Sequence, residues 1–339
     1  MKRRHYYQII SEYRRLRSLY GTDLRQICLQ LIRQFGQLIA SYNSSDRTAA
    51  ATVADNDTDR SDDQHWIQCV IYSLAAYEFK CEIKPSAASV TAAIASYGVS
   101  NNNNIKSLMN IAQEVGISYT MAAQYVLQNR YNHDKSLTKT MSANTSHIAD
   151  GRLAVDVMLC HLNDIVFGNH SNHMTNNSGL VFESEVSQLL HRNDISYVSE
   201  RQLRIDDCFD VTPDFKLNVP LIVKTLGVAN NTVAANHCTD GSDICLIKVN
   251  NYFAKNNTKF IVDNDSTANY TPINWIECKS MFASDLCHSK YYRNQYSNYV
   301  NRFGSGLVIY KYGYVRPVPV QYTLNIIITD RLPKIMHTF

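Results

Sequence analysis

Two acidic residues and a lysine in the second half of the chain have the types and spacing needed to handle phosphate. Asp214 follows a Thr-Pro pair at the start of the alternating stretch "FKLNVPL". Glu277 and Lys279 lie two positions apart at the end of the apolar stretch "INWIECK". Both stretches predict β-strands, and residues two apart on a strand point to the same face. Two carboxylates and a lysine at one sheet edge suit phosphodiester hydrolysis with Mg²⁺ or Mn²⁺, in which Lys279 offsets charge on the phosphate.

The same three residues also have a plainer interpretation. An aspartate before a strand is often only a turn residue. A Glu-x-Lys pair on a strand is often only part of a solvated face. The spacing alone therefore does not distinguish a catalytic site from an ordinary strand, and the elements around it have to decide.

The segment after the lysine supplies such elements. The stretch "CHSKYYRNQYSNYVNRFGSGLVIYKYG" predicts a helix ending at Gly304 and then a buried strand of the kind found in parallel sheets. Gln295, Tyr299 and Arg302 recur at helical spacing, so they share one face of that helix. The order helix, strand, strand, helix, strand, with carboxylates at strand ends, predicts an α/β endonuclease core over residues 178–339.

Two further features of this half follow from its pattern. A helix is expected from about 180 to 192, which places Glu183 one or two turns into it, and a short strand is expected at 195–198. A long segment, from about residue 226 to 270, separates the two acidic strands. Within it, "ICLIKVN" and "KFIVD" could form an additional hairpin.

The first half of the chain predicts helices. Apolar residues at helical spacing fill residues 5–40, with a break at "YGTD", and define a basic helical module over 1–42. Residues 43–63 are polar and acidic and predict a linker. Residues 64–177 predict a helical domain, in which "SLMNIAQEVGISYTMAAQYVL" has the small residues, glycine turn and serine cap of a helix-turn-helix. A helical hairpin in a bundle can show the same pattern.

Positive charge is concentrated at the start of the chain, although the net charge of the 339 residues is only +3. Residues 1–40 hold eight Lys and Arg against Glu12 and Asp23. This excess could meet the phosphates of a nucleic acid, or it could be the solvated face of amphipathic helices. The residues that would contact nucleic acid are Arg3, Arg4, Arg14, Arg15 and Arg17.

Composition bounds the remaining function classes. Nine scattered cysteines and the lack of an apolar secretory segment predict reduced thiols and a cytosolic or nuclear protein. No apolar stretch is long enough to span a membrane, and no Walker or Rossmann glycine pattern is present. The cysteines and histidines lack the paired spacing of a structural zinc site, so we interpret them as ordinary core or surface residues. The groups considered were Cys160, His161, His170 and His173; Cys278, Cys287 and His288; and His237 and Cys238.

In combination, "TPDF", "WIECK" and "NQYSNYVNRFGSGLVIYKYG" resemble the TPD-motif proteins of the PD-(D/E)XK nuclease-like superfamily, and among them the codanin-interacting nucleases of animals. The resemblance covers residues 179–315, apart from an insertion at about 226–270, and extends more weakly into the helical half. It implies an α+β protein, with helix-turn-helix-like modules followed by a restriction-endonuclease-like core. It also implies a nuclear location with the cytoplasm as a second location, codanin as a partner, and a role in red-cell differentiation.

The resemblance implies a role for each site residue. Asp214 and Glu277 match the metal ligands, and Lys279 matches the catalytic lysine. Glu183 matches a helical glutamate that assists placement of the metal or of water, and Gln295 matches a helical glutamine that supports the site or touches the nucleic-acid backbone. The chain departs from the family by its insertion and by Cys278 between the acid and the lysine, a position that should face away.

Three hypotheses about function remain open at this point. The first is a magnesium-dependent nuclease, with DNA as the expected nucleic acid. The second is a non-catalytic adaptor that keeps the nuclease fold in order to bind codanin or DNA. The third is a helix-turn-helix DNA-binding protein whose C-terminal domain is only structural.

Overall fold

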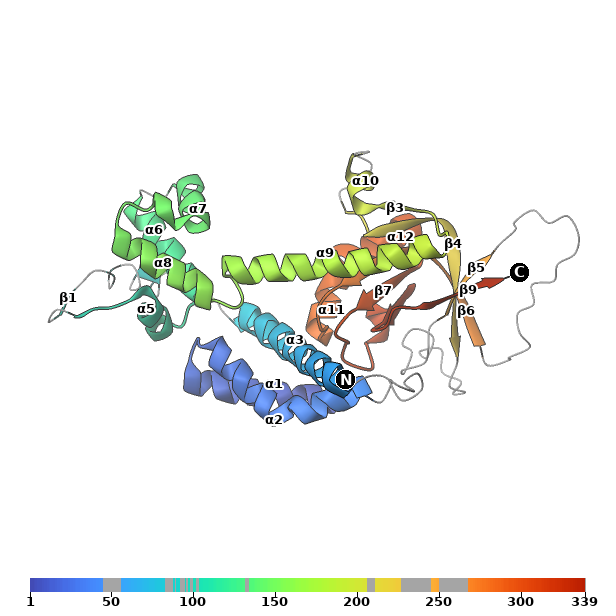
Figure 1. The fold of residues 1–339 in the computed structure, drawn as a ribbon, viewed down its shortest axis with the longest axis horizontal. Helices are drawn as coiled ribbons and strands as arrows, with labels where there is room; N and C mark the ends of the chain where they lie inside the picture. Colours follow the sequence, from blue (N-terminus) through green and yellow to red (C-terminus); the bar gives the residue numbers. More distant parts are fainter. Residues whose placement is uncertain are drawn as a thin grey trace, which may run out of the picture. The chain divides into compact units, whose positions relative to one another are not determined.

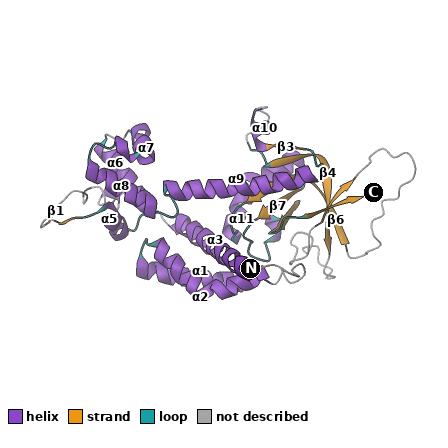
Figure 2. Ribbon diagram, viewed as in Figure 1, coloured by secondary structure: helices purple, strands orange, loops and turns teal. Residues whose placement is uncertain are grey.

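The protein is described by a computed structural model that covers residues 1–44, 56–82, 88, 90–91, 95, 97, 100–101, 104–131, 134–205, 211–226, 245–249 and 268–338. Helices come first and a core built on a mixed β-sheet follows (Figures 1 and 2). The predicted α+β class and the order of its parts are therefore confirmed. The chain forms two compact units: Met1–Tyr6, Tyr42–Ala54 and Ser178–Phe339 make the first, and Tyr7–Ser41 and Asp55–Asn177 make the second.

The second unit is helical. Its helices are α1 (Arg3–Tyr20), α2 (Leu24–Ser44), α3 (Asn56–Glu82), α5 (Leu108–Val115), α6 (Tyr119–Arg130), α7 (Lys135–Ala143), a 3₁₀ turn (Thr145–His147), α8 (Gly151–Asn163) and the start of α9 (Asn169–Arg192). Between α3 and α5, the short strands β1 (Ser100–Asn101) and β2 (Asn104–Ile105) pair with each other. The break between α1 and α2 falls at "YGTD" as predicted, where Asp23 Oδ1 accepts a hydrogen bond from the N–H of Gln26. Helix α3 begins at Asn56, inside the range 43–63 for which the sequence predicts a linker.

The helix-turn-helix pattern forms α5, a tight turn and α6. Gly116 ends α5 with φ of 77°, a left-handed conformation that glycine adopts without strain. Ser118 then caps α6, because its hydroxyl accepts a hydrogen bond from the N–H of Met121. Leu108 and Ile111 from α5 and Val126 from α6 are buried together with residues of α8. The two helices therefore pack as the sequence predicts.

The first unit is built on a seven-stranded sheet with the order β8-β7-β6-β4-β5-β9, and with β3 paired to β4. Its strands are β3 (Tyr197–Ser199), β4 (Phe215–Leu226), β5 (Cys245–Val249), β6 (Ala268–Lys279), β7 (Gly306–Tyr310), β8 (Ile326–Thr329) and β9 (Lys334–Thr338). Strands β4 and β6 run antiparallel, whereas β6, β7 and β8 are parallel. The parallel pairing predicted for the strand after Gly304 is thus confirmed.

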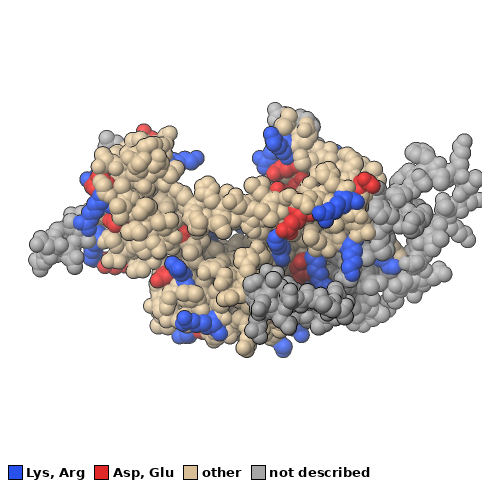
Figure 3. All heavy atoms as spheres, in the orientation of Figure 1, with Lys and Arg blue, Asp and Glu red and all other residues tan. Residues whose placement is uncertain are grey.

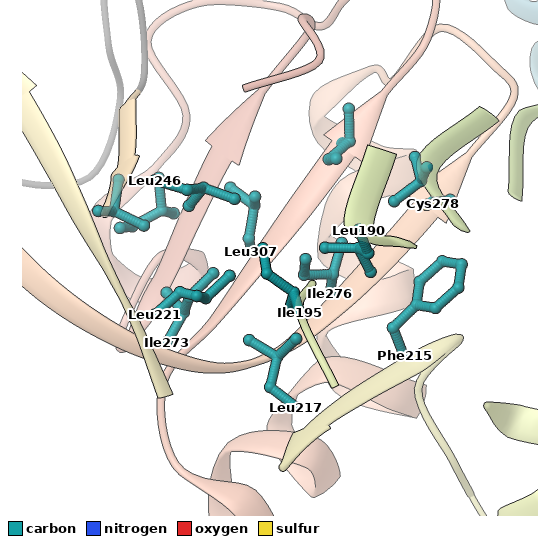
Figure 4. Packing of buried hydrophobic residues seen from close by; sticks show 14 of the residues in the cluster. Leu190, Ile195, Phe215, Leu217, Leu221, Leu246, Ile273, Ile276, Cys278 and Leu307 are labelled. Carbon is teal, nitrogen blue, oxygen red and sulfur yellow. The ribbon is translucent and has the colours of Figure 1, made fainter. Parts of the chain in front are cut away.

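Helices lie on both faces of this sheet. They are the part of α9 from Ser178 on, α10 (Glu200–Ile205), α11 (Asp285–Tyr291), a π-helical turn (Tyr292–Tyr296), α12 (Ser297–Phe303) and a 3₁₀ turn (Val320–Tyr322). Apolar residues of α9, Leu190 among them, pack on one face against Phe215, Ile276, Cys278 and Leu307 (Figure 4). Tyrosines of α11 to α12 pack on the other face. Helix α9 begins at Asn169, eleven positions before the predicted start, so Glu183 lies well inside it.

One part of the predicted alternation in β4 is wrong. Leu217 and Leu221 are buried as expected, but Val219 between them is 51% exposed. The pairing of β4 with β6 shifts register between Lys216 and Leu221, and Pro220 in that stretch has no N–H to donate to a ladder. The bulge turns Val219 away from the core.

The insertion contributes one described strand. "ICLIKVN" yields β5, which pairs antiparallel with β4 and parallel with β9. "KFIVD" lies outside the described residues. No helix among the described residues is long and apolar enough to cross a membrane.

Candidate active site

Asp214 and Glu277 are neighbours across the β4–β6 pair. Phe215 lies opposite Ile276 in the antiparallel register, so Asp214, just before β4, lies opposite Glu277 near the end of β6. The N–H of Asp214 donates to Oε2 of Glu277 at 3.2 Å, and the N–H of Cys278 donates to Oδ2 of Asp214 at 2.7 Å. Each carboxylate is therefore fixed by a backbone group of the other strand.

Lys279 completes this arrangement. Its Nζ lies 2.5 Å from Oε1 of Glu277, which shows that the two side chains share a face as their spacing predicts. Cys278 points the other way, into the cluster that contains Phe215 and Ile276. The alternation of β6 thus separates the polar site from the core.

The two carboxylates are in an environment that disfavours their ionised forms. Burial and the charge of Glu277 raise the pKa of Asp214 well above its ordinary value, although Lys279 opposes the shift. Burial also raises the pKa of Glu277, whose side chain is only 3% exposed. A positive group beside these carboxylates relieves the cost, and Lys279 is the first such group.

Two further glutamates lie within electrostatic range. Burial raises the pKa of Glu183, and the charges of Glu200 and Glu277 raise it further. Glu200 begins α10, and its N–H donates to the backbone oxygen of Asp214 at 3.0 Å. Its carboxylate also pairs with Arg204 at 2.6 Å. Glu200 was not predicted from the sequence, because the pairing of β3 with β4 between distant segments brings it beside Asp214.

The Thr-Pro turn before Asp214 is held by α12. The hydroxyl of Tyr299 donates to the backbone oxygen of Thr212 at 2.8 Å, and Arg302 Nη1 donates to that of Val211 at 3.2 Å. Tyr299 and Arg302 do share a helix face, and that face fixes the two residues that lead into Pro213 and Asp214.

Gln295 lies on the same stretch but has a different setting. It is part of the π-helical turn, a distortion that often accompanies functional sites. Its Oε1 is enclosed and accepts no hydrogen bond from any described residue. The structure brings Asp214, Glu277 and Lys279 together and places Glu183 within electrostatic range of Glu277 and Lys279. No hydrogen bond or ion pair between described residues joins Gln295 to them, and its role stays a prediction.

Two of the five arginines expected at a nucleic acid lie in the first unit and have partners there. Arg3 pairs with Asp285 at 2.9 Å and donates to the backbone oxygen of Pro317 at 2.7 Å. Arg4 Nε donates to Nε2 of His5 at 3.1 Å. Arg3 therefore anchors the start of the chain within this unit.

The other three arginines lie on α1 in the helical unit. Arg14 pairs with Glu78 at 3.6 Å and Arg15 with Glu12 at 2.6 Å, yet the side chains of both arginines stay more than half exposed. Arg17 donates to the backbone oxygen of Gly21. On the face shown in Figure 3, basic and acidic side chains occur in small mixed groups. The arginines are thus engaged within the protein, and Arg14 and Arg15 also remain open to an outside anion.

The donor chemistry of the site fits a divalent cation. Asp214 and Glu277 are adjacent acidic side chains with raised pKa values, and hard oxygen donors of this kind suit Mg²⁺ and Mn²⁺. In their present positions, however, no three His, Cys, Asp or Glu side chains of the described residues are close enough to enclose a metal. The same holds for the zinc candidates among them. His288, for example, is hydrogen-bonded to Tyr310 and Tyr322.

The chain is similar to one described protein family and to several named proteins. A family described as "Protein of unknown function TPD sequence-motif" matches residues 149–242 and 248–332. CDAN1-interacting nuclease 1 of Mus musculus and of Homo sapiens are each 27% identical to the chain over 280 residues, which cover 78% of this chain and 83% of theirs. The Bos taurus protein of that name is 28% identical over 263 residues, 74% of this chain and 77% of its own. No solved structure matches the chain. Because the family match extends over more than half of the sequence and spans the positions of Asp214, Glu277 and Lys279, the chain belongs to the TPD sequence-motif family.

Proposed function

We propose that this protein is a metal-dependent phosphodiesterase of the PD-(D/E)XK type that acts on nucleic acid. The observation that carries the proposal is the contact set of Asp214, Glu277 and Lys279. Two carboxylates from antiparallel strands are fixed side by side, and a lysine ammonium lies 2.5 Å from one of them. A fold has no structural need for adjacent buried carboxylates, because their ionised forms repel each other.

Each residue has a distinct task in this proposal. Asp214 and Glu277 hold the divalent cation, and Glu183 from α9 assists placement of the metal or of water. Lys279 carries a compact positive charge, and its mostly buried side chain lies beside Glu277. From there the ammonium can orient water and offset negative charge on a phosphate. A bound Mg²⁺ or Mn²⁺ supplies Lewis-acid polarisation of the phosphate and activates water at neutral pH.

The relatives support the choice of nucleic acid as substrate. The mouse and human proteins are named as nucleases that interact with CDAN1, and we propose the same activity and a codanin partner for this chain. We take DNA as the first substrate to test, because the helix-turn-helix formed by α5 and α6 is a common DNA-binding element. A nuclear location and a role in red-cell differentiation are parts of the proposal that rest on resemblance alone.

A second candidate function is a non-catalytic adaptor. The observation in its favour is that protein groups already hydrogen-bond Oδ2 of Asp214 and both oxygens of Glu277. A scaffold that has lost its metal could retain these bonds. In that case the nuclease fold would serve only to bind codanin or DNA.

A cleavage assay separates the two candidates. Labelled single-stranded, duplex, flapped and branched DNA and RNA are incubated with the full chain and Mg²⁺ or Mn²⁺. The wild type is expected to cut at least one substrate, and Asp214→Ala and Lys279→Met are expected to lose at least about 100-fold of that rate. Asp194→Asn is the control, since Asp194 is an exposed carboxylate and asparagine tolerates its positive φ of 51°. A wild type that cuts none of these substrates would leave the adaptor as the better account.

A further inference from the structure

The side chain of Lys279 lies between a carboxylate and an aromatic ring. On one side is the carboxylate of Glu277, 2.5 Å away. On the other is the ring of Tyr291, whose centroid lies 5.0 Å from Nζ of Lys279. A lysine ammonium within about 6 Å of an aromatic centroid is attracted by the negative face of the ring, most strongly where water is partly excluded. The Lys279 side chain is 17% exposed, so this contact is substantially desolvated.

Tyr291 is well suited to hold another side chain because it is itself fixed. It ends α11, and its ring stacks on that of Tyr296 with centroids 6.1 Å apart and an angle of 20° between the rings. Tyr296 is fully buried and also packs against Trp275 and Tyr299. The ring that faces Lys279 therefore rests on the aromatic cluster beneath the sheet.

A directed hydrogen-bond chain fixes Tyr296 in turn. His288 Nε2 lies 2.9 Å from the backbone oxygen of Tyr322, which can only accept, so Nε2 carries the proton. Nδ1 of His288 then accepts from the hydroxyl of Tyr310 at 2.8 Å, and that hydroxyl accepts from Tyr296 at 3.0 Å. Burial lowers the pKa of His288, which agrees with the neutral ring that this chain requires. The rings of Tyr296, Tyr310 and His288 thus have defined orientations.

Lysine needs such a support at this position. Its four-carbon side chain has many rotamers, and its point charge has no directional preference of its own. With Glu277 as its single partner, the ammonium could move anywhere around that carboxylate. The ring face limits it to positions on the side of α11.

We propose that Tyr291 is a positioning residue for Lys279, and that the face of its ring, rather than its hydroxyl, holds the ammonium where the reaction needs it. The proposal rests on the nuclease function proposed above. It assigns a role to a tyrosine that the spacing of Asp214, Glu277 and Lys279 does not reveal. It also gives the π-helical turn a purpose, since that turn follows Tyr291 directly and carries Tyr296 beneath it.

Three variants test the proposal. Tyr291→Phe keeps the ring and removes the hydroxyl, whereas Tyr291→Leu and Tyr291→Met remove the ring and keep an apolar side chain. The first readout needs no substrate or metal: NMR of the full chain labelled with ¹³C-lysine, with the Lys279 signals identified by their loss in Lys279→Met. Protons above a ring face are shifted upfield, so we expect upfield Lys279 signals in the wild type and in Tyr291→Phe, and ordinary positions in Tyr291→Leu and Tyr291→Met.

The second readout is steady-state cleavage. We expect kcat to fall about tenfold in the variants without a ring, to recover in Tyr291→Phe, and KM to change by less than about twofold. An upfield Lys279 signal in Tyr291→Leu and Tyr291→Met, or a kcat in Tyr291→Phe as low as in those variants, would overturn the proposal. If the wild type cuts nothing, the proposed function fails, and the NMR comparison alone decides whether Tyr291 positions Lys279.

Discussion

The backbone N–H of Asp214 donates to Oε2 of Glu277 at 3.2 Å, although the two residues are 63 positions apart in the sequence. A second bond returns from the N–H of Cys278 to Oδ2 of Asp214. The antiparallel pairing of β4 and β6 thereby holds two acidic side chains in contact. This arrangement has measurable consequences for stability, for pH dependence and for metal binding.

The metal-free protein should gain stability when one of these charges is removed. Burial and Glu277 raise the pKa of Asp214 in the folded state, so the folded protein binds this proton more tightly than the unfolded chain does. Folding therefore becomes less favourable as the pH rises from the unfolded to the folded pKa, and the penalty persists at pH 7. In the presence of a chelator, Asp214→Asn should raise the Tm at pH 7 by about 2–4 °C, the response of a domain of this size to about 1 kcal/mol.

Below the unfolded pKa of aspartate, about 3.9, both states are protonated and the difference in Tm should vanish. Asp194→Asn is the matched control, because Asp194 is exposed and asparagine tolerates its positive φ of 51°. That variant should leave the Tm nearly unchanged at both pH values. A lower Tm for Asp214→Asn at pH 7 would show that the pair does not repel as described.

Removing Lys279 should have the opposite effect on stability. Lys279→Met leaves the carboxylate of Glu277, only 3% exposed, without its positive partner. Breaking a buried pair in this way typically costs about 3 kcal/mol of unfolding free energy, which denaturant unfolding at pH 7 would measure. Lys106→Met is the comparison, since Lys106 and Glu114 form a pair at 2.8 Å with both side chains about half exposed. It should cost less than about 1 kcal/mol, and equal losses in the two variants would contradict the burial argument.

The hydrogen bond from Tyr299 to the Thr-Pro turn can be tested by removing one oxygen atom. Tyr299→Phe removes the hydroxyl that donates to the backbone oxygen of Thr212 at 2.8 Å and leaves that buried acceptor unpaired. We expect a loss of about 1–2 kcal/mol in unfolding free energy and a slower cleavage rate, because Asp214 follows two residues later. Tyr20→Phe on the more exposed end of α1 should change neither quantity. Unchanged cleavage in Tyr299→Phe would show that the turn does not depend on this bond.

The contact between β6 and β7 depends on the absence of a side chain at Gly306. A Cβ atom at that position would come within 2.0 Å of Trp275, which is fully buried opposite it. Gly306→Ala should therefore cost about 1–3 kcal/mol. Gly179→Ala on α9 is a control of opposite sign, because nothing lies within 4 Å of its Cβ position and alanine favours helix. Thermal unfolding of both variants checks the prediction, and a stable Gly306→Ala would rule out the close packing.

The sequence correctly predicted features that depend only on residues a few positions apart. The two-residue spacing of Glu277 and Lys279 placed them on one face, and Cys278 does point into the core. Gly304 ends its helix, and Ser118 caps α6, because backbone conformation and N–H groups impose these roles within a few residues. Such features need no knowledge of the rest of the fold.

Features that depend on pairing between distant segments could not be predicted in this way. Val219 is exposed because β4 shifts register against β6, which its own alternation does not show. Glu200 approaches the site through the β3–β4 pairing and a bond to the backbone of Asp214, and Tyr291 through the contact of its ring with Lys279 of β6. The early start of α9 was missed because the polar stretch "NHSNHMTNNSG" resembles a loop by composition.

The central claim is that Asp214 and Glu277 form a metal site, and calorimetric titration of the full chain with Mn²⁺ or Mg²⁺ tests it most directly. We expect the wild type and Glu114→Gln to bind the metal, and the double variant Asp214→Asn/Glu277→Gln to lose binding while remaining folded. Binding that persists unchanged in the double variant, or a wild type that binds neither ion, would contradict the claim.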